Sequence, residues 1–311
     1  MSQEKSKHSK ISLEEFQTRF EESSHPTLTT ISFGFGAMTD QMSHQFFQFA
    51  AFTFYYAVIG IDLIYLAPSY IFFAIWDSIN DPLIGLISDK TKSKFGRRRF
   101  WVLVSLVPFA LTNLFLFFPP KLWPSRIETE WINTAYMIAL ICLYDLFYTM
   151  FSANQTALFP EMCKSEKERA KANRIKNTLI IVGVLIGFAL PSFLINPKAP
   201  GEDPTLLEEI SIGEQYFYVG ILVGILTLIL GYMFFKFGMK EDAPDYTNPD
   251  QMPGIKESLK ATFSNRPFMI FIVANMLNWT VFKLLTAIIA LYGQWVLGIG
   301  ENDFTLTLML L

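Results

Sequence analysis

The sequence predicts an all-α membrane protein that crosses the bilayer several times, and three observations support this fold class. Hydrophobic residues make up 51% of the 311-residue chain and charged residues only 17%, less than the roughly 25% of an average soluble domain. The apolar residues gather into runs long enough to cross a hydrocarbon core of about 30 Å as helices. Lysine and arginine gather in alternate connections between these runs, as they do in polytopic membrane proteins.

Seven apolar runs have the length of a transmembrane helix. They lie at residues 31–58, 63–88, 100–118, 132–158, 178–195, 216–236 and 267–292. An eighth run begins near Phe304 and reaches Leu311. A helix of that length would extend only about 12 Å, less than half of the hydrocarbon core. We therefore expect the complete protein to continue beyond this chain.

The basic residues predict which side of the membrane each connection faces. The N-terminal tail and the connections after the second, fourth and sixth runs hold most of the lysines and arginines, whereas the alternate connections hold only Lys121, Arg126 and Lys198. Connections rich in lysine and arginine remain in the cytoplasm. We expect an integral protein of the plasma membrane with a cytoplasmic N-terminus.

This pattern predicts four parts of the chain. They are a cytoplasmic tail at 1–29, a six-helix transmembrane bundle at 30–237, a cytoplasmic linker at 238–265 and the start of an incomplete second bundle at 266–311. The linker contains several Pro, Asp and Asn residues, which favour loops. Six spans, a polar linker and further spans form the layout of a two-bundle transporter. The sequence contains no nucleotide-binding loop, metal-spaced His/Cys cluster or nucleophile elbow. We expect no enzymatic activity, no cofactor and no nucleic-acid partner.

Residues 76–100 form the most informative segment. Asp77 and Asp81 lie four residues apart in an apolar run, so a helix places both carboxylates on one face, with Asn80 beside them. Pro82 follows and frees the backbone carbonyl four residues earlier. Charged groups inside a span usually mark an ion or substrate path, and two carboxylates with an amide suit a small cation. The alternative is a carboxylate pair that shares a proton, and a proton is also a coupling ion.

Polar side chains on the first and fourth runs predict a solute path. Each set shares one face of its helix at 100° per residue. The predicted solute residues are Asp40, Gln41, His44 and Gln45 on the first run and Asp145, Ser152 and Thr156 on the fourth. A polar face inside a membrane points to the bundle interior or to water, although helix–helix hydrogen bonding is an alternative. Thr149 on the same face is positioned to offer a hydroxyl to the cation. Lys283 in the seventh run either pairs with an acid or extends towards the membrane interface.

The end of the second run carries a candidate inner gate. Asp89 follows four residues after Gly85, and Arg97 and Arg98 stand in the basic connection beyond. Glycine allows helices to approach closely, and a carboxylate accepts strong hydrogen bonds from arginine. The alternative is that the basic residues only anchor the connection to anionic lipid.

Five segments resemble the glycoside–pentoside–hexuronide:cation symporters, the melibiose permease-like family of the major facilitator superfamily. They are SFGFGAM (32–38), IWDSINDPLIG (75–85), DKTKSKFGRRRFW (89–101), YTMFSANQTALFPEM (148–162) and KERAKANR (167–174). The resemblance implies twelve helices in two bundles, alternating access, and sugar uptake driven by Na⁺, H⁺ or Li⁺. It also implies a cation site at Asp77, Asn80, Asp81 and Thr149.

The sugar site of that family matches this chain less well. Where the galactoside carriers place acids on helices one and four, this chain has Gln41 and Ser152. Where they place an aromatic and an arginine, it has Thr156 and Asn177. The leading hypothesis is cation-coupled symport of a sugar or glycoside, with Na⁺ or H⁺ as the coupling ion and membrane lipid as the surroundings. The second is transport of a lipid-like or other organic solute, and the third is a receptor or scaffold that transports nothing.

Overall fold

The computed structural model describes residues 27–91, 93–120, 130–163, 165–195, 206–240 and 263–295. The chain divides into two compact units, Met1–Pro244 and Asp245–Leu311. Most of the predicted tail and linker, and the end of the predicted second bundle, lie outside the described residues.

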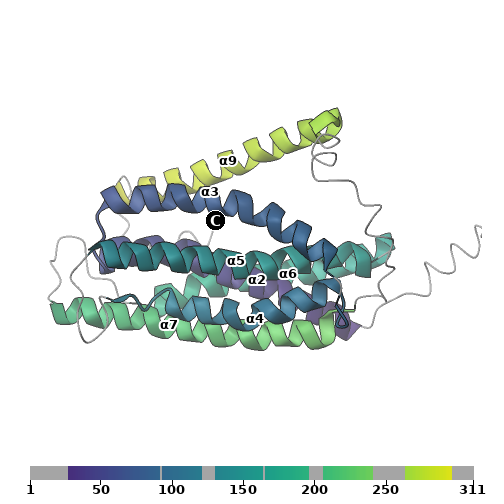
Figure 1. Cartoon of the computed structure of the whole chain (residues 1–311), viewed down its shortest axis with the longest axis horizontal. Helices are drawn as coiled ribbons and strands as arrows, with labels where there is room; N and C mark the ends of the chain where they lie inside the picture. The colour runs from purple at the N-terminus through teal and green to yellow at the C-terminus, as the bar shows by residue number, and fades with distance from the viewer. Residues whose placement is uncertain are drawn as a thin grey trace, which may run out of the picture. The chain divides into compact units, whose positions relative to one another are not determined.

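The first unit consists of long helices that run side by side (Figure 1). They are α2 (Thr27–Thr53), α3 (Leu63–Lys90), α4 (Arg97–Phe115), α5 (Glu130–Met162), α6 (Glu166–Leu194) and α7 (Leu206–Met233). Two of these helices end in a π-helical turn: α2 continues into η1 (Phe54–Val58) and α7 into η3 (Phe234–Gly238). In the second unit, the described residues form one long helix, α9 (Arg266–Trp295). No strand occurs among the described residues, and the all-α prediction is confirmed.

Each predicted apolar run coincides with one of these helices. Among the described residues, four segments meet the length and composition needed for a membrane crossing: Leu63–Lys90, Glu130–Met162, Glu166–Pro191 and Ile212–Gly238. The other three predicted spans do not. Helix α2 carries several polar side chains, and α4 begins with three arginines.

The connection predicted between the fourth and fifth spans is helical. Helix α5 continues to Met162 and α6 begins at Glu166. The Ser165 side chain accepts the backbone N–H of Glu168 at 3.2 Å, which is the serine half of a capping-box sequence. Lysine and arginine are good helix formers, so the basic residues expected in a loop occupy the first turns of α6 instead.

Glycine contacts bring two pairs of helices close together. A Cβ atom added to Gly183 or Gly187 of α6 would lie 2.6 Å from a carbonyl oxygen of α2. A Cβ added to Gly220 or Gly224 of α7 would lie 2.8 Å from a carbonyl oxygen of α4. Both pairs have the small-xxx-small spacing that lets membrane helices pack backbone to backbone.

Two glycines with positive φ flank α3 in the chain. Gly60, between η1 and α3, has φ of 76°, and Gly96, just before α4, has φ of 100°. Residues other than glycine rarely adopt such backbone angles. The chain therefore turns sharply before α3 begins and again after it ends.

The core of the first unit is strongly aromatic. Phe54 packs its ring against those of Phe117 and Tyr216 at 5.2 and 5.0 Å, and Phe46 contacts Phe117 at 4.8 Å. The buried hydroxyl of Tyr55 donates to the Leu116 carbonyl oxygen at 2.6 Å. These contacts join the end of α2 to α4 and α7.

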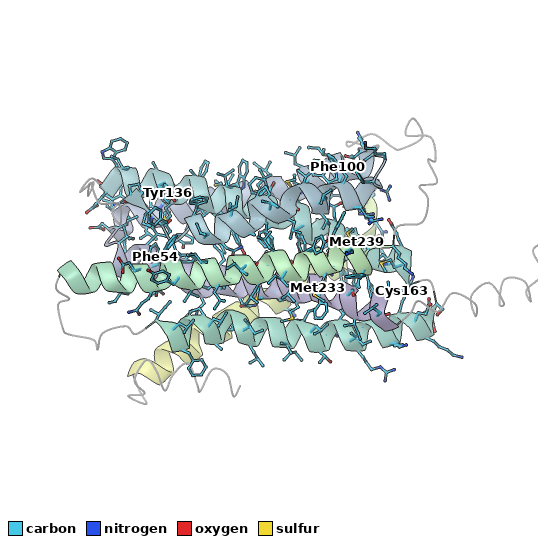
Figure 2. The ribbon with its side chains drawn as sticks, turned by 90° about the horizontal axis from the view of Figure 1, so that it is seen from below. Phe54, Phe100, Tyr136, Cys163, Met233 and Met239 are labelled. Atoms are coloured by element: carbon cyan, nitrogen blue, oxygen red, sulfur yellow. The ribbon has the colours of Figure 1, made fainter. Side chains whose placement is uncertain are left out.

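The bundle has two distinct ends. Figure 2 shows Phe54 and Tyr136 near one end and Phe100, Cys163 and Met239 near the other. The second group adjoins the basic start of α4, the start of α6 and the end of η3. The described connections that are rich in basic residues therefore lie at the same end, which we name the basic end.

Candidate functional site

Helices α3 and α5 bring together the polar side chains predicted for a cation site. Asn80 Nδ2 donates to Asp145 Oδ2 at 2.9 Å, and Thr149 Oγ1 donates to Asp81 Oδ1 at 2.9 Å. Asp145 also lies within hydrogen-bonding reach of Asp77 and within electrostatic range of Asp81. We name these five residues the carboxylate cluster.

Local structure explains why the α3 residues share one face. Helix α3 continues unbroken through Pro82 to Lys90, so the four-residue spacing keeps Asp77 and Asp81 about one turn apart. Asn80 is buried, Asp77 is half-buried and Asp81 is exposed on the surface of the described structure. On α5, Asp145 and Thr149 are buried one turn apart. The cluster therefore extends from the interior of the unit to its surface.

Asp145 joins the residues predicted for the cation site. It was expected on the solute path, yet its carboxylate contacts α3, because α3 packs against α5 at this level and places Asn80 opposite it. The cluster thus contains three carboxylates. Within the part of the chain that the structure describes, no three His, Cys, Asp or Glu side chains converge closely enough to hold a metal ion by themselves. A small cation here would also draw on the amide and hydroxyl oxygens.

A second group of predicted residues gathers around Tyr148 of α5. The His44 ring stacks on the Tyr148 ring at 5.1 Å and 23°, and the Tyr148 side chain lies near Asp40 and Ser152. Asp40 is only 7% exposed. Its Oδ2 accepts from Gln41 Nε2 at 2.9 Å, while its Oδ1 is buried without a hydrogen-bond donor among the described residues.

The remaining predicted solute residues do not join this group. Gln45 is half-buried and Thr156 is exposed, and none of the described contacts brings either to Tyr148. The sequence analysis gave Tyr148 no role. Its signal was its position one turn before Ser152 within the polar stretch of α5.

The predicted gate residues meet an acid that the sequence analysis missed. Glu161, in the last turn of α5, accepts hydrogen bonds from Arg97 at 3.1 Å and from Arg98 at 2.8 and 3.0 Å. Asp89 lies 3.6 Å from the same Arg98 guanidinium. A recognisable signal for Glu161 was an acidic residue at an otherwise basic end of the bundle.

Gly85, predicted to allow a close helix approach at the gate, has open space around it among the described residues, and its gating role stays a prediction. A Cβ atom added there would meet no atom within 4 Å, so no described helix approaches it closely. The side chain of Lys283 lies outside the described residues, and its predicted role is untested.

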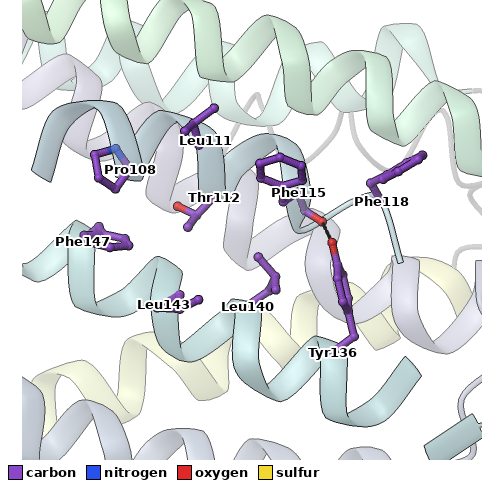
Figure 3. A pocket seen from close by; sticks show the side chains of 9 residues that line it. All are labelled: Pro108, Leu111, Thr112, Phe115, Phe118, Tyr136, Leu140, Leu143 and Phe147. Atoms are coloured by element: carbon purple, nitrogen blue, oxygen red, sulfur yellow. Dashed lines mark hydrogen bonds between the residues drawn. The ribbon is translucent and has the colours of Figure 1, made fainter. Parts of the chain in front are cut away.

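An apolar groove lies apart from both groups, between α4 and α5 (Figure 3). It has a volume of about 530 Å³ and is lined mainly by apolar side chains such as Leu111 and Leu143. The Tyr136 hydroxyl in its wall already donates to the Phe115 carbonyl oxygen at 2.8 Å. The groove offers few polar partners, so it does not suit a hydroxyl-rich solute.

Comparisons with known proteins agree with this architecture. A family model described as MFS/sugar transport protein matches residues 32–311. An uncharacterized symporter from Synechocystis is 24% identical over 88% of this chain and 62% of its own length. An isoprimeverose transporter from Lactiplantibacillus pentosus is 23% identical over 73% of this chain and 44% of its own length. A sodium-dependent lysophosphatidylcholine symporter from Gallus gallus is 24% identical over 74% of this chain and 46% of its own length.

The chain spans about half the length of these relatives. The matched family and the four long apolar helices identify an integral membrane protein. Because the family model covers nearly the whole chain and agrees with the motif resemblance, the chain belongs to the MFS/sugar transport protein family, the melibiose permease-like branch of the major facilitator superfamily.

Proposed function

We propose that the protein is a cation-coupled symporter that carries a sugar or glycoside across the plasma membrane by alternating access. The observation that carries this proposal is the carboxylate cluster, in which three acids from two membrane-spanning helices share neutral hydrogen-bond donors. Such a cluster is costly in a membrane unless it serves an ion or a proton.

Electrostatics favours a cation as the ligand of this cluster. Like charges held close together in a medium of low dielectric constant destabilise one another, and the cost of each desolvated charge is several kcal/mol. A bound cation offsets both terms, and oxygen ligands suit a hard monovalent ion. We propose Na⁺ as the ion, supported by the sodium-dependent relatives, with H⁺ as the alternative.

The group around Tyr148 is the proposed solute site. Aromatic faces pack against the apolar faces of sugar rings, and the unsatisfied Oδ1 of Asp40 would accept a hydrogen bond from a solute hydroxyl. The isoprimeverose transporter among the relatives supports a glycoside. A lipid-like solute is the second candidate, favoured by the lysophosphatidylcholine symporters among the relatives.

The contacts at the basic end support a role in alternating access. Glu161 and Asp89 bind the arginines of α4 there. If this end faces the cytoplasm, as the distribution of basic residues predicts, these contacts weight the equilibrium between states that open to opposite sides.

Uptake into proteoliposomes tests the proposal directly. Full-length protein is reconstituted and supplied with radiolabelled isoprimeverose, other glycosides or lysophosphatidylcholine, each with an inward gradient of Na⁺, of H⁺ or of neither. We expect accumulation of a glycoside that requires the Na⁺ gradient. Accumulation of lysophosphatidylcholine alone would favour the second candidate. Binding without accumulation under any gradient would indicate a receptor, and the symporter proposal would then be wrong.

A further inference from the structure

Three buried polar side chains from three helices meet inside the first unit, and no part of the proposed ion or solute site uses them. They are Ser43 of α2, Asn113 of α4 and Tyr144 of α5, and each is at most 1% exposed. Ser43 Oγ donates to Asn113 Oδ1 at 2.8 Å, and the Tyr144 hydroxyl lies 3.2 Å from Ser43 Oγ. We name this set the three-helix junction.

Each hydrogen bond of the junction has one assignable donor and one acceptor. Asn113 Nδ2 donates to the Phe109 carbonyl oxygen at 2.9 Å, which orients the amide and leaves Oδ1 as the acceptor. The Ser43 hydroxyl gives its one proton to that Oδ1, so the Tyr144 hydroxyl is the donor to Ser43. Breaking this chain inside a membrane protein would leave buried polar groups unsatisfied. The junction therefore holds α5 at one rotation relative to α2 and α4.

Stacked rings extend the junction towards the proposed solute site. The Tyr144 ring lies nearly parallel to that of Phe47 at 4.5 Å and 17° and to that of Tyr148 at 6.0 Å and 4°. Tyr148 in turn stacks on His44. Because Phe47 and His44 belong to α2, the stack links α2 and α5 at the residue after Ser43 and again about one turn further along α2.

The junction also adjoins the carboxylate cluster. Asp145 follows Tyr144 directly and contacts α3, whereas Tyr144 contacts Ser43 of α2 and the Phe109 ring of α4. Consecutive side chains on an α-helix are separated by about 100°. A rotation of α5 that moves Asp145 therefore moves Tyr144, and with it Ser43 of α2.

We propose that the three-helix junction couples the two sites: it transmits cation occupancy of the carboxylate cluster, as a rotation of α5, to the face of α2 that carries Asp40 and His44. This inference rests on the proposed function and identifies the residues that connect its ion to its solute. Ser43, Asn113 and Tyr144 are positioning residues that touch neither ligand.

A bond elsewhere in the same unit offers a matched control. The Tyr55 hydroxyl also donates from the end of α2 towards α4, at 2.6 Å to the Leu116 carbonyl oxygen, and is equally buried. It contacts no member of the carboxylate cluster or of the Tyr148 group in the described structure. If the junction only stabilises helix packing, Tyr144→Phe and Tyr55→Phe should change the Na⁺ dependence of the reporter equally.

A single cysteine on α2 reports the transmitted change. Cys142→Ala and Cys163→Ala first remove both cysteines from the full-length protein, and Gln45→Cys then introduces the single reporter. The reporter cysteine is labelled in proteoliposomes by a membrane-impermeant maleimide, once in NaCl and once in choline chloride. We expect Na⁺ to change the labelling rate several-fold. Tyr144→Phe or Ser43→Ala should reduce that ratio by about three- to ten-fold, the range of one lost hydrogen bond and of common site-to-site coupling. The Na⁺ concentration at half effect should stay within about two-fold, and Tyr55→Phe should leave the ratio unchanged.

Three results would overturn the inference. An unchanged ratio in both junction variants would show that the junction transmits nothing. An equal loss in Tyr55→Phe would indicate general loosening of the helices. A labelling rate indifferent to Na⁺ in the reporter, while its solute uptake remains Na⁺-dependent, would separate α2 from the ion site. If uptake by wild-type protein is itself independent of Na⁺ and H⁺ gradients, the proposed function fails and this inference with it.

Discussion

Two groups of acidic residues in the first unit differ in the charge of the donors that surround them. At the basic end, Glu161 and Asp89 contact the guanidinium groups of Arg97 and Arg98. In the carboxylate cluster, the donors are the amide of Asn80 and the hydroxyl of Thr149, both neutral. Three ion pairs, Arg97–Glu161, Arg98–Glu161 and Arg98–Asp89, thus lie at the basic end.

This difference separates a structural from a responsive role. An acid paired with a fixed arginine carries its own counter-charge, so it can hold two helix ends together without any ligand. An acid that has only neutral donors in a membrane keeps an unbalanced charge, at a cost of several kcal/mol. Under the proposed function, a bound cation would relieve that cost, and the free energy released would be available to bias the protein's conformation.

The strongest test of this comparison removes charge from the carboxylate cluster. Asp77→Asn and Asp81→Asn should each abolish cation-stimulated uptake, with a loss of Na⁺ affinity of at least about 100-fold, because each carboxylate supplies charge that an amide cannot. Uptake is measured against Na⁺ concentration. Ser78→Ala, whose hydroxyl bonds only within α3, is the control. Wild-type Na⁺ dependence in both aspartate variants would remove these residues from the ion site.

Removal of the fixed acid at the basic end should act on turnover rather than on binding. Glu161→Gln deprives Arg97 and Arg98 of their shortest charged contact, so we expect uptake to fall by about ten-fold or more while equilibrium binding of Na⁺ and solute is retained. Asp89→Asn should have the smaller effect, because Asp89 lies 3.6 Å from Arg98 and its side chain is 49% exposed. Parallel losses of binding and uptake would contradict a gate at this end.

Asp145→Asn tests whether Asp145 belongs to the ion site or to the solute site. The variant loses a charge but keeps an oxygen that can accept from Asn80, so half-saturating Na⁺ should rise by about ten-fold. Solute affinity measured at saturating Na⁺ should not change. A fall in solute affinity with unchanged Na⁺ dependence would return Asp145 to the solute path on which the sequence analysis placed it.

We expect the smallest effect on Na⁺ affinity from Thr149, the uncharged hydroxyl of the carboxylate cluster. Thr149→Ala removes one hydroxyl donor from Asp81, a loss of about 1 kcal/mol, or roughly five-fold in Na⁺ affinity. Thr156→Ala, two turns further along α5 and exposed, is the matched control and should leave Na⁺ affinity unchanged. Equal effects in the two variants would exclude Thr149 from the site.

The predictions that needed only one helix agreed best with the structure. The shared face of Asp77, Asn80 and Asp81 follows from helical geometry alone, and the helix positions follow from the apolar runs. The early start of α6 was missed because its first turns are charged, and hydropathy reports the apolar part of a helix rather than its full length.

The contacts between helices could not be predicted from one helix at a time. Asp145 shares its face with Ser152, and only the level at which α3 crosses α5 assigns it to the carboxylate cluster. Gly85 has a spacing that suits close packing, yet no described helix lies against it. Glu161 became visible only when the end of α5 was placed beside the start of α4. Contacts between distant segments are not encoded by local periodicity.

The close glycine packing described above also has a mechanical consequence. Backbone contact at Gly183 and Gly187 leaves no compressible side-chain layer between α2 and α6, and the same holds for α4 and α7. We therefore expect each helix pair to move as one rigid body. Helix α3, by contrast, packs mainly on α5 and is joined to the chain through turns at Gly60 and Gly96. Under the proposed function, a change in the tilt of α3, the helix that carries Asp77 and Asp81, would therefore disturb neither glycine-packed pair.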